Sequence, residues 1–326
     1  MNSSLSQILN EIKSLDREAM EAARSRQDEL TKPRGSLGRL EELSIKVAGI
    51  KGNIISGFKH KAIIVMVADH GVASEGVSLY PQEVTRQMVF NFLNSGAAIN
   101  ALARLVGARI VVVDMGVIGG FDPHLDLVCE MIDFGTKDFT KGAAMTREQA
   151  SDAIQAGIDV VEGEIAKGLD IVGTGDMGIG NTTASSAICA VITGEAVEKV
   201  TGRGTGLADE QLVHKVKVVQ KALEVNRPES QDPIDVLAKV GGFEIGGLAG
   251  VMLGAAAHRI PVVIDGFISG AAALIATGLA PGLRDYLIAG HLSTESGHKI
   301  LLEYLGLTPL LNLSMRLGEG TGAALG

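Results

Sequence analysis

Residues 173–183 read Gly-Thr-Gly-Asp-Met-Gly-Ile-Gly-Asn-Thr-Thr, and this stretch is the most informative part of the sequence. It follows a short run at residues 169–172 that predicts a buried parallel strand. Residues 184–188 predict the start of a helix, capped by Asn181 or by a threonine. Glycine has no Cβ to keep an anion away, and free N–H groups at a helix N-terminus attract negative charge. The stretch therefore predicts a phosphate-binding loop.

Three other short apolar runs predict strands that are buried on both faces. They cover residues 63–68, 110–113 and 262–264, and each of them ends at an aspartate. Helical patterns separate the runs, which is typical of right-handed βαβ crossovers in a parallel sheet. Ligands bind at the carboxyl edge of such a sheet. The sequence thus predicts an α/β fold, a Rossmann-like parallel sheet with flanking helices and a ligand site at that edge.

The two ends of the chain show a different, helical pattern. Residues 5–15 carry leucine and isoleucine at helical spacing, and the leucine-rich residues 293–313 again look helical. We therefore expect a smaller helical domain from residues 1–50 and 293–326, which includes a C-terminal catalytic loop. Residues 51–292 would then form the Rossmann-like nucleotide-binding domain.

The charge balance narrows the class of partner. The chain has 29 basic and 38 acidic residues, which gives a net charge of −9. This balance disfavours a nucleic-acid surface, because such a surface needs clustered Lys and Arg. It does not disfavour a small anionic substrate that is held in a local pocket. We therefore expect a small-molecule ligand and no nucleic acid.

Several features bear on where the protein works. Cys129 and Cys189 form no CxxC pair, which predicts a reducing, cytoplasmic compartment. The first four residues lack the basic and apolar regions of a signal peptide. Residues 266–283 carry no charge, but their glycine and alanine content and Pro281 favour a buried helix over a membrane span. We therefore expect a cytoplasmic protein that does not enter a membrane.

The glycine spacing of the first loop also fits a second interpretation. Gly173, Gly175 and Gly178 match the dinucleotide fingerprint G-x-G-x-x-G, which would indicate an NAD-dependent enzyme. That fingerprint needs an acidic residue at the end of the next strand, about 20 residues further on. Glu195 and Glu198 stand at this distance, but the chain there runs directly into another glycine loop. A mononucleotide-phosphate loop is therefore favoured over a dinucleotide site and over a purely structural turn.

Two further glycine-rich loops carry candidate chemistry. Residues 202–206 read Gly-Arg-Gly-Thr-Gly and precede a helix with Lys215, which suits a phosphate and a ribose or else a flexible connector. Residues 316–322 place the single carboxylate of Glu319 among glycines. Such a segment is either a frayed tail or a close approach of a general base to a ligand. The seven histidines, His70 among them, show no metal-ligand spacing, so we expect no metal.

Long motifs along almost the whole chain resemble the nicotinate-nucleotide–dimethylbenzimidazole phosphoribosyltransferase family. The resemblance rests on residues 32–41, 68–72, 80–85, 177–183, 202–206, 265–269 and 316–322. It implies a pentosyl-transferring enzyme (EC 2.4.2.21) of cobalamin biosynthesis that acts in nucleotide loop assembly. A nitrogen of 5,6-dimethylbenzimidazole would attack C1′ of nicotinate mononucleotide, nicotinate would leave, and α-ribazole 5′-phosphate would form with inversion. The resemblance further implies a homodimer that needs neither metal nor cofactor.

The resemblance also implies roles for individual residues. Glu319 matches the family's general base. The positions that match its substrate contacts are Tyr80, Gln87 and Met88 in the acceptor pocket, Gly175, Asp176, Met177, Gly178, Ile179, Gly180, Asn181, Thr182, Gly202, Arg203, Gly204 and Lys215 around the nucleotide, and Leu317, Gly318 and Gly320 beside the base. Asp176 stands where the family usually has Glu, which predicts a positioning role. Tyr80 stands where some relatives have serine, which leaves the preferred acceptor open.

Three other functions stay open at this point. A related transferase with this fold could use adenine, another base or a phenol as its acceptor. A non-catalytic nucleotide-binding protein would keep the phosphate loops but would not need Glu319. A dehydrogenase would instead bind NAD and change the absorbance of its nicotinamide.

Overall fold

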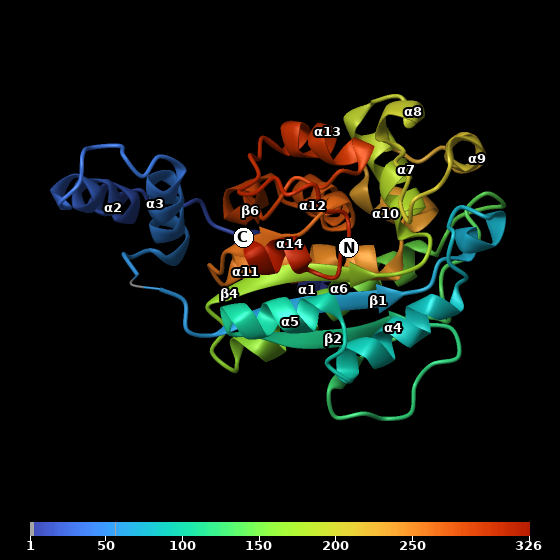
Figure 1. The fold of residues 1–326 in the computed structure, drawn as a ribbon, viewed down its shortest axis with the longest axis horizontal. Coiled ribbons are helices and arrows are strands. Elements are labelled where there is room, and N and C mark those ends of the chain that lie inside the picture. Colours follow the sequence, from blue (N-terminus) through green and yellow to red (C-terminus); the bar gives the residue numbers. More distant parts are fainter. Residues whose placement is uncertain (1–2, 56) are drawn as a thin grey trace.

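The computed structural model describes residues 3–55 and 57–326, and a parallel sheet lies at the centre of this part (Figure 1). Every pairing between neighbouring strands is parallel, and the spatial order is β3-β2-β1-β4-β5-β6. The strands are β1 (Lys61–Ala68), β2 (Ala108–Gly116), β3 (Leu127–Cys129), β4 (Ile171–Met177), β5 (Val262–Ile264) and β6 (Leu287–Ala289). The predicted α/β fold class is confirmed.

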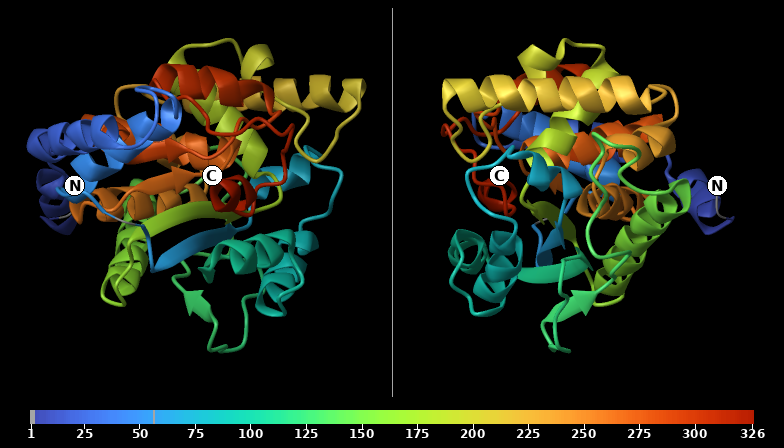
Figure 2. Two further views of the ribbon diagram at one scale, coloured as in Figure 1. Left: turned by 60° about the vertical axis from the view of Figure 1, so that its left-hand side comes forward. Right: turned by 90° about the vertical axis from the view of Figure 1, so that its right-hand side faces the viewer.

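Helices cover both faces of this sheet (Figure 2). They are α1 (Ser3–Glu11), α2 (Arg17–Glu29), α3 (Arg39–Lys51), η1 (Gly71–Glu75), α4 (Glu83–Leu93), α5 (Ala98–Val106), α6 (Arg147–Ile165), α7 (Asn181–Thr193), α8 (Val197–Val200), α9 (Asp209–Asn226), α10 (Pro233–Val240), α11 (Phe243–Ala257), α12 (Phe267–Leu279), η2 (Pro281–Tyr286), α13 (Ser296–Leu305) and α14 (Thr321–Leu325). The larger core lies on the side of α6, α11 and α12, and the smaller one lies beneath α4 and α5.

Strand β1 shows why the apolar runs form strands that are buried on both faces. Successive side chains of a strand point to opposite faces. Ile64 and Met66 enter the larger core, whereas Ile63, Val65 and Val67 enter the smaller one. Full burial of one such side chain stabilises the fold by roughly 1.5–3 kcal/mol. An unbroken apolar run is therefore what a central strand of this sheet requires.

The strand order places the site. From β1 the chain moves outward to β2 and β3, and it then returns to β4 on the other side of β1. The direction of winding reverses between β1 and β4, which leaves a crevice beyond their carboxyl ends. Val67 of β1 pairs with Met177 of β4 at this edge. The glycine-rich residues that follow β4 thus begin at the crevice.

The structure corrects the expected course of the first glycine loop. Strand β4 continues to Met177, so Gly175 lies within the strand and not in a turn. A Cβ at Gly175 would lie 2.6 Å from the carbonyl oxygen of Glu319, so this glycine makes room for the C-terminal segment. Helix α7 is preceded by Gly180 at φ 101°, and not by a side-chain cap from Asn181 or a threonine. Residues 197–200 form α8, so no strand follows where a dinucleotide site needs one.

The chain ends differ in part from the helical pattern expected for them. Helix α13 ends at Leu305 because Gly306 adopts φ 66° and Pro309 follows shortly after, so residues 307–313 are not helical. Helices α2 and α3 pack against each other as a projecting arm (Figure 1). Arg39 of α3 donates to the carbonyl oxygen of Thr308 at 2.7 Å. The division into two domains stays a prediction.

The uncharged stretch at residues 266–283 forms the buried helix α12 and the start of η2. Across residues 3–55 and 57–326, no helix combines the length and the apolar character that a membrane crossing requires. Residues 1 and 2, on which part of the signal-peptide expectation rests, lie outside the described part of the chain.

Candidate active site

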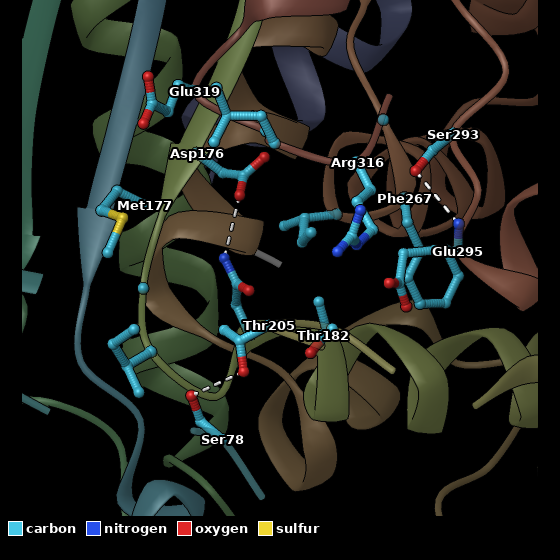
Figure 3. Close-up of a pocket in the computed structure, with 18 of the residues that line it drawn as sticks. Ser78, Asp176, Met177, Thr182, Thr205, Phe267, Ser293, Glu295, Arg316 and Glu319 are labelled. Carbon is cyan, nitrogen blue, oxygen red and sulfur yellow. Dashed lines mark hydrogen bonds between the residues drawn. The ribbon is translucent and has the colours of Figure 1, made fainter. Parts of the chain in front are cut away.

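A cavity of about 600 Å³ opens at the carboxyl ends of β1 and β4 (Figure 3). This volume is within the usual range for small-molecule sites. Five segments far apart in the sequence supply its lining: residues 77–88, 176–182, 204–205, 266–268 and 291–319. The cavity therefore forms where the sheet order predicts a ligand site.

A buried cation lies beneath one end of this cavity, which we call the phosphate end (Lys215, Thr182 and Gly204). Lys215 of α9 is fully buried, and its Nζ donates to Thr182 Oγ1 at 2.8 Å. Thr182 belongs to the first turn of α7, where the N–H groups and the helix dipole favour an anion. Burial lowers the pKa of Lys215 to about 8, although the nearby Glu295 opposes this shift. The structure thus brings both glycine loops and Lys215 together.

Gly204 allows the second glycine loop to lie close to Lys215. The residue adopts φ 51°, a left-handed conformation that favours glycine. A Cβ there would lie 2.9 Å from Thr182 Oγ1 and 3.1 Å from Lys215 Nζ. Any larger residue would therefore press on the groups that could bind an anion.

Glu319 lies at the opposite end, which we call the base end (Glu319 and Asp176; Figure 3). Its side chain is buried, and its Oε2 has no hydrogen-bond partner within the described part of the chain. Burial raises the pKa of the Glu319 carboxyl, whereas the N–H of Ile99 at the start of α5 lowers it. A carboxylate with a raised pKa and a free oxygen is suited to accept a proton.

The buried carboxylate of Asp265 holds the loop that carries Glu319. It accepts N–H groups from Gly320 at 3.1 Å, from Gly322 at 2.6 Å and from Ala323 at 3.2 Å. Glu319 itself adopts φ 62°, which is uncommon outside glycine and needs support from its surroundings. Burial raises the pKa of Asp265 to about 7, even though the three N–H groups lower it. The Asp265 side chain therefore holds the backbone of the loop that carries Glu319.

Asp176 extends from the end of β4 into the cavity (Figure 3). Its Oδ2 accepts a hydrogen bond from Asn181 Nδ2 at 3.0 Å, and its Oδ1 has no partner among the residues described. Burial raises the pKa of Asp176 well above its ordinary value, and the nearby Asp265, Glu244 and Glu319 add to the shift. A protonated Asp176 can donate as well as accept a hydrogen bond.

Apolar side chains form part of the cavity wall. They are Val77, Tyr80, Val84, Met88, Met177 and Leu317. Tyr80 is 56% exposed, so its ring lies at the rim. The N–H of Leu79 donates to Thr205 Oγ1 at 3.0 Å, which ties this wall to the second glycine loop. Such a wall suits a flat aromatic ligand.

Six of the predicted substrate contacts do not line this cavity: Gly175, Gly202, Arg203, Lys215, Gln87 and Gly320. Lys215 lies directly beneath the lining, against Thr182. Gln87 lines a separate cavity of about 240 Å³ with Asp69 and Phe90. Arg203 donates to the Leu207 carbonyl oxygen at 2.7 Å and also pairs with Asp209. Substrate contact by all the predicted residues stays a prediction.

Among the lining residues that the sequence reasoning missed are Phe267, Ser293, Glu295 and Arg316. Arg316 and Phe267 stand within motifs that carry the family resemblance, which was a usable signal. Glu295 stands in no glycine loop and follows no strand directly, so only the folded chain places it here. As far as the structure describes the chain, it contains no group of three or more His, Cys, Asp or Glu residues that could hold a metal.

The chain resembles known proteins along almost its whole length. A family profile described as phosphoribosyltransferase matches residues 12–326. A nicotinate-nucleotide–dimethylbenzimidazole phosphoribosyltransferase of Desulforudis audaxviator (strain MP104C) is 62% identical over 99% of this chain and 91% of its own length. The chain belongs to this family. A relative from Roseiflexus sp. (strain RS-1) with the same name is 60% identical, again over 99% of this chain and 91% of its own.

A solved structure confirms the fold of the family. The nicotinate-nucleotide–dimethylbenzimidazole phosphoribosyltransferase of Thermus thermophilus superposes with a TM-score of 0.91 at 46% identity. The match covers 95% of this chain and 92% of the other. Family membership removes the dehydrogenase interpretation, as does the helix α8 at the place of the required strand.

Proposed function

We propose that the protein transfers the 5-phosphoribosyl group of nicotinate mononucleotide to 5,6-dimethylbenzimidazole. The products are α-ribazole 5′-phosphate and nicotinate, in the assembly of the cobamide lower ligand. One observation carries the proposal: a single cavity of about 600 Å³ has a phosphate end with buried Lys215 and a base end with Glu319. The names of the relatives at 62% and 60% identity support the same reaction.

The two ends fit the two halves of this reaction. The N-terminus of α7, the second glycine loop and Lys215 hold the 5′-phosphate, which places C1′ toward the base end. The apolar wall with Met88 and Leu317 holds the acceptor ring. A benzimidazole nitrogen then attacks C1′ from the face opposite the pyridinium, and nicotinate leaves with inversion. Because the leaving group is already cationic, its departure requires no protonation by the protein.

Glu319 acts as the general base of this reaction. The attacking benzimidazole carries an N–H on its second nitrogen, and attack without deprotonation would produce a cation. The Glu319 carboxylate removes this proton, and its raised pKa brings it nearer to the pKa of the group that it deprotonates. General-base catalysis of this kind typically contributes about 10²- to 10⁴-fold in rate.

Asp176 positions the substrates and does not transfer the proton. Its Oδ2 is held by Asn181, and a Cβ at Gly318 would lie only 3.3 Å from it, so the side chain has little freedom. Its remaining oxygen faces no protein partner among the described residues and is available to a ribose hydroxyl.

A product assay tests the reaction directly. The protein is incubated with nicotinate mononucleotide and, separately, with dimethylbenzimidazole, adenine and a phenol, and the products are identified by mass. We expect α-ribazole 5′-phosphate as the main product, in equal amount to the nicotinate released. Nicotinate mononucleotide that binds without product from any acceptor would favour a non-catalytic nucleotide-binding protein. Product from adenine or phenol alone would move the function to another acceptor.

Two further properties complete the proposal. The resemblance supports a homodimer, and light scattering at micromolar concentration should give about twice the chain mass of 33.9 kDa. A mass near that of one chain would contradict it. We also place the reaction in the cytoplasm, which the free thiols of Cys129 and Cys189 support.

A further inference from the structure

Glu295 is a buried acidic side chain at the phosphate end of the cavity, where an anion has to bind. It lines the cavity on the side away from Glu319 (Figure 3) and is 7% exposed. Its Oε2 has no hydrogen-bond partner among the residues described. A Cβ at Gly202 would overlap this oxygen, so the second glycine loop lies directly against the carboxylate. Neither the catalytic base nor the proposed phosphate contacts account for this residue.

The groups around Glu295 include two that we assign to the phosphate, Lys215 and Gly204. Lys215 faces it from α9, the Gly204 N–H faces it from the second glycine loop, and Arg316 faces it from the segment before α14. Burial raises the pKa of the Glu295 carboxyl above its ordinary value, and these three groups oppose the shift because they favour the ionised form. His298, from the same stretch of chain, has a pKa lowered by burial to about 3 and is therefore neutral. Burial also lowers the pKa of His291, so Lys215 and Arg316 are the cations that act on the carboxyl.

An ionised carboxylate beside a doubly charged phosphate would repel it strongly in a buried site. The repulsion disappears when the phosphate keeps one proton and donates it to the carboxylate, as a P–O–H···carboxylate hydrogen bond. A phosphate monoester can take part because its second pKa is about 6. Sulfate remains fully ionised at neutral pH and has no proton to share.

We propose that Glu295 shares a proton with the bound 5′-phosphate and thereby makes the cavity selective for phosphate monoesters over sulfate. The inference rests on the proposed function, because it places the nucleotide phosphate at Lys215. Glu295 is then a specificity-determining residue, distinct from the base Glu319. A charge-assisted hydrogen bond contributes roughly 10- to 150-fold in affinity. The preference for phosphate over sulfate should be of this order.

The test compares sulfate and inorganic phosphate as competitors of nicotinate mononucleotide at pH 7, by titration calorimetry on the full chain. We expect phosphate to compete at least about 10-fold better than sulfate with the unaltered protein. In Glu295→Gln the side-chain N–H groups can donate to either anion, and no shared proton is needed. The preference for phosphate over sulfate should therefore fall below about threefold. Glu303→Gln, an exposed glutamate on α13, is the matched control and should keep the full preference.

A second variant and a second readout separate this role from simple damage to the fold. Glu295→Asp keeps a group that can share a proton, so it should retain the preference for phosphate even if affinity falls. Binding near pH 7.5 should take up a proton in the unaltered protein, measured in buffers of different ionisation enthalpy. Glu295→Gln should take up less.

Equal competition by sulfate and phosphate in the unaltered protein, or an unchanged preference in Glu295→Gln, would overturn the inference. If nicotinate mononucleotide still binds and reacts in that case, only the inference fails. If the unaltered protein does not bind nicotinate mononucleotide at all, the proposed function fails as well.

Discussion

The two ends of the cavity solve opposite electrostatic problems. At the phosphate end a cation is buried, and burial lowers the pKa of Lys215 to about 8, so that its charged form is less stable until an anion binds. At the base end the described residues bury only carboxyls, with no cation beside them as Lys215 lies beside Glu295, and burial raises the pKa of both Glu319 and Asp176. The phosphate end thus favours the binding of an anion, and the base end favours the uptake of a proton. Under the proposed function, we expect affinity for the nucleotide and the rate of proton removal to depend on different residues.

The largest effect is expected at the base end. Glu319→Gln keeps the shape of the side chain but cannot accept a proton, so turnover should fall at least about 100-fold. The affinity for nicotinate mononucleotide should stay nearly unchanged, because the phosphate end is intact. Single-turnover kinetics measures the chemical step. A loss below about tenfold would mean that water or another group removes the proton and that Glu319 only binds substrate.

The next largest effect is expected at the phosphate end. Lys215→Ala removes a charge-assisted contact worth roughly 1.5–3 kcal/mol, which corresponds to about 10- to 150-fold in nucleotide affinity. Titration calorimetry with nicotinate mononucleotide measures this directly. Lys217→Ala on the same helix is the control, and its affinity should match that of the unaltered protein. Unchanged affinity in Lys215→Ala would remove the phosphate assignment.

Gly175 sharpens the comparison, because sequence and structure assign it to different ends. The sequence places it in the phosphate loop, whereas a Cβ there would press on the backbone of Glu319 at 2.6 Å. Gly175→Ala should therefore lower turnover by about tenfold through a displaced base loop, with nucleotide affinity maintained. Gly163→Ala, where a Cβ meets open space on α6, is the control. If Gly175→Ala instead loses affinity for the nucleotide and keeps its turnover, Gly175 acts at the phosphate end, as the sequence predicts.

The smallest effect is expected for Asp176. Asp176→Asn keeps the hydrogen-bonding shape and should lower turnover only a few-fold, in keeping with the typical value of one neutral hydrogen bond, about 0.5–1.5 kcal/mol. Asp176→Glu restores the residue usual in the family and should be tolerated. Steady-state kinetics on both variants decides the matter. If Asp176→Asn is as inactive as Glu319→Gln, the positioning role is wrong.

The sequence predicted the local parts of the site better than the parts that depend on contacts across the chain, for a physical reason. The phosphate loops are local: a strand, glycines and a helix start are contiguous, and the fold class follows from the same pattern. The base end depends on contacts across the chain, such as the hydrogen bonds from Gly320, Gly322 and Ala323 to Asp265. No local pattern indicates that Gly175 lies beneath that loop. The sequence did not indicate a role for Glu295 for the same reason, because the groups that surround it come from other segments.

The most direct test of this division between the two ends is a double-variant cycle of Glu319→Gln and Lys215→Ala. Distant sites that act independently have additive effects within about 0.3–0.5 kcal/mol. The nucleotide affinity of the double variant should therefore equal that of Lys215→Ala, and its single-turnover rate at saturating nucleotide should equal that of Glu319→Gln. The opposite result would be a loss of affinity in Glu319→Gln, or a rate loss in Lys215→Ala that saturating nucleotide does not restore. Either would contradict separate roles for the two ends.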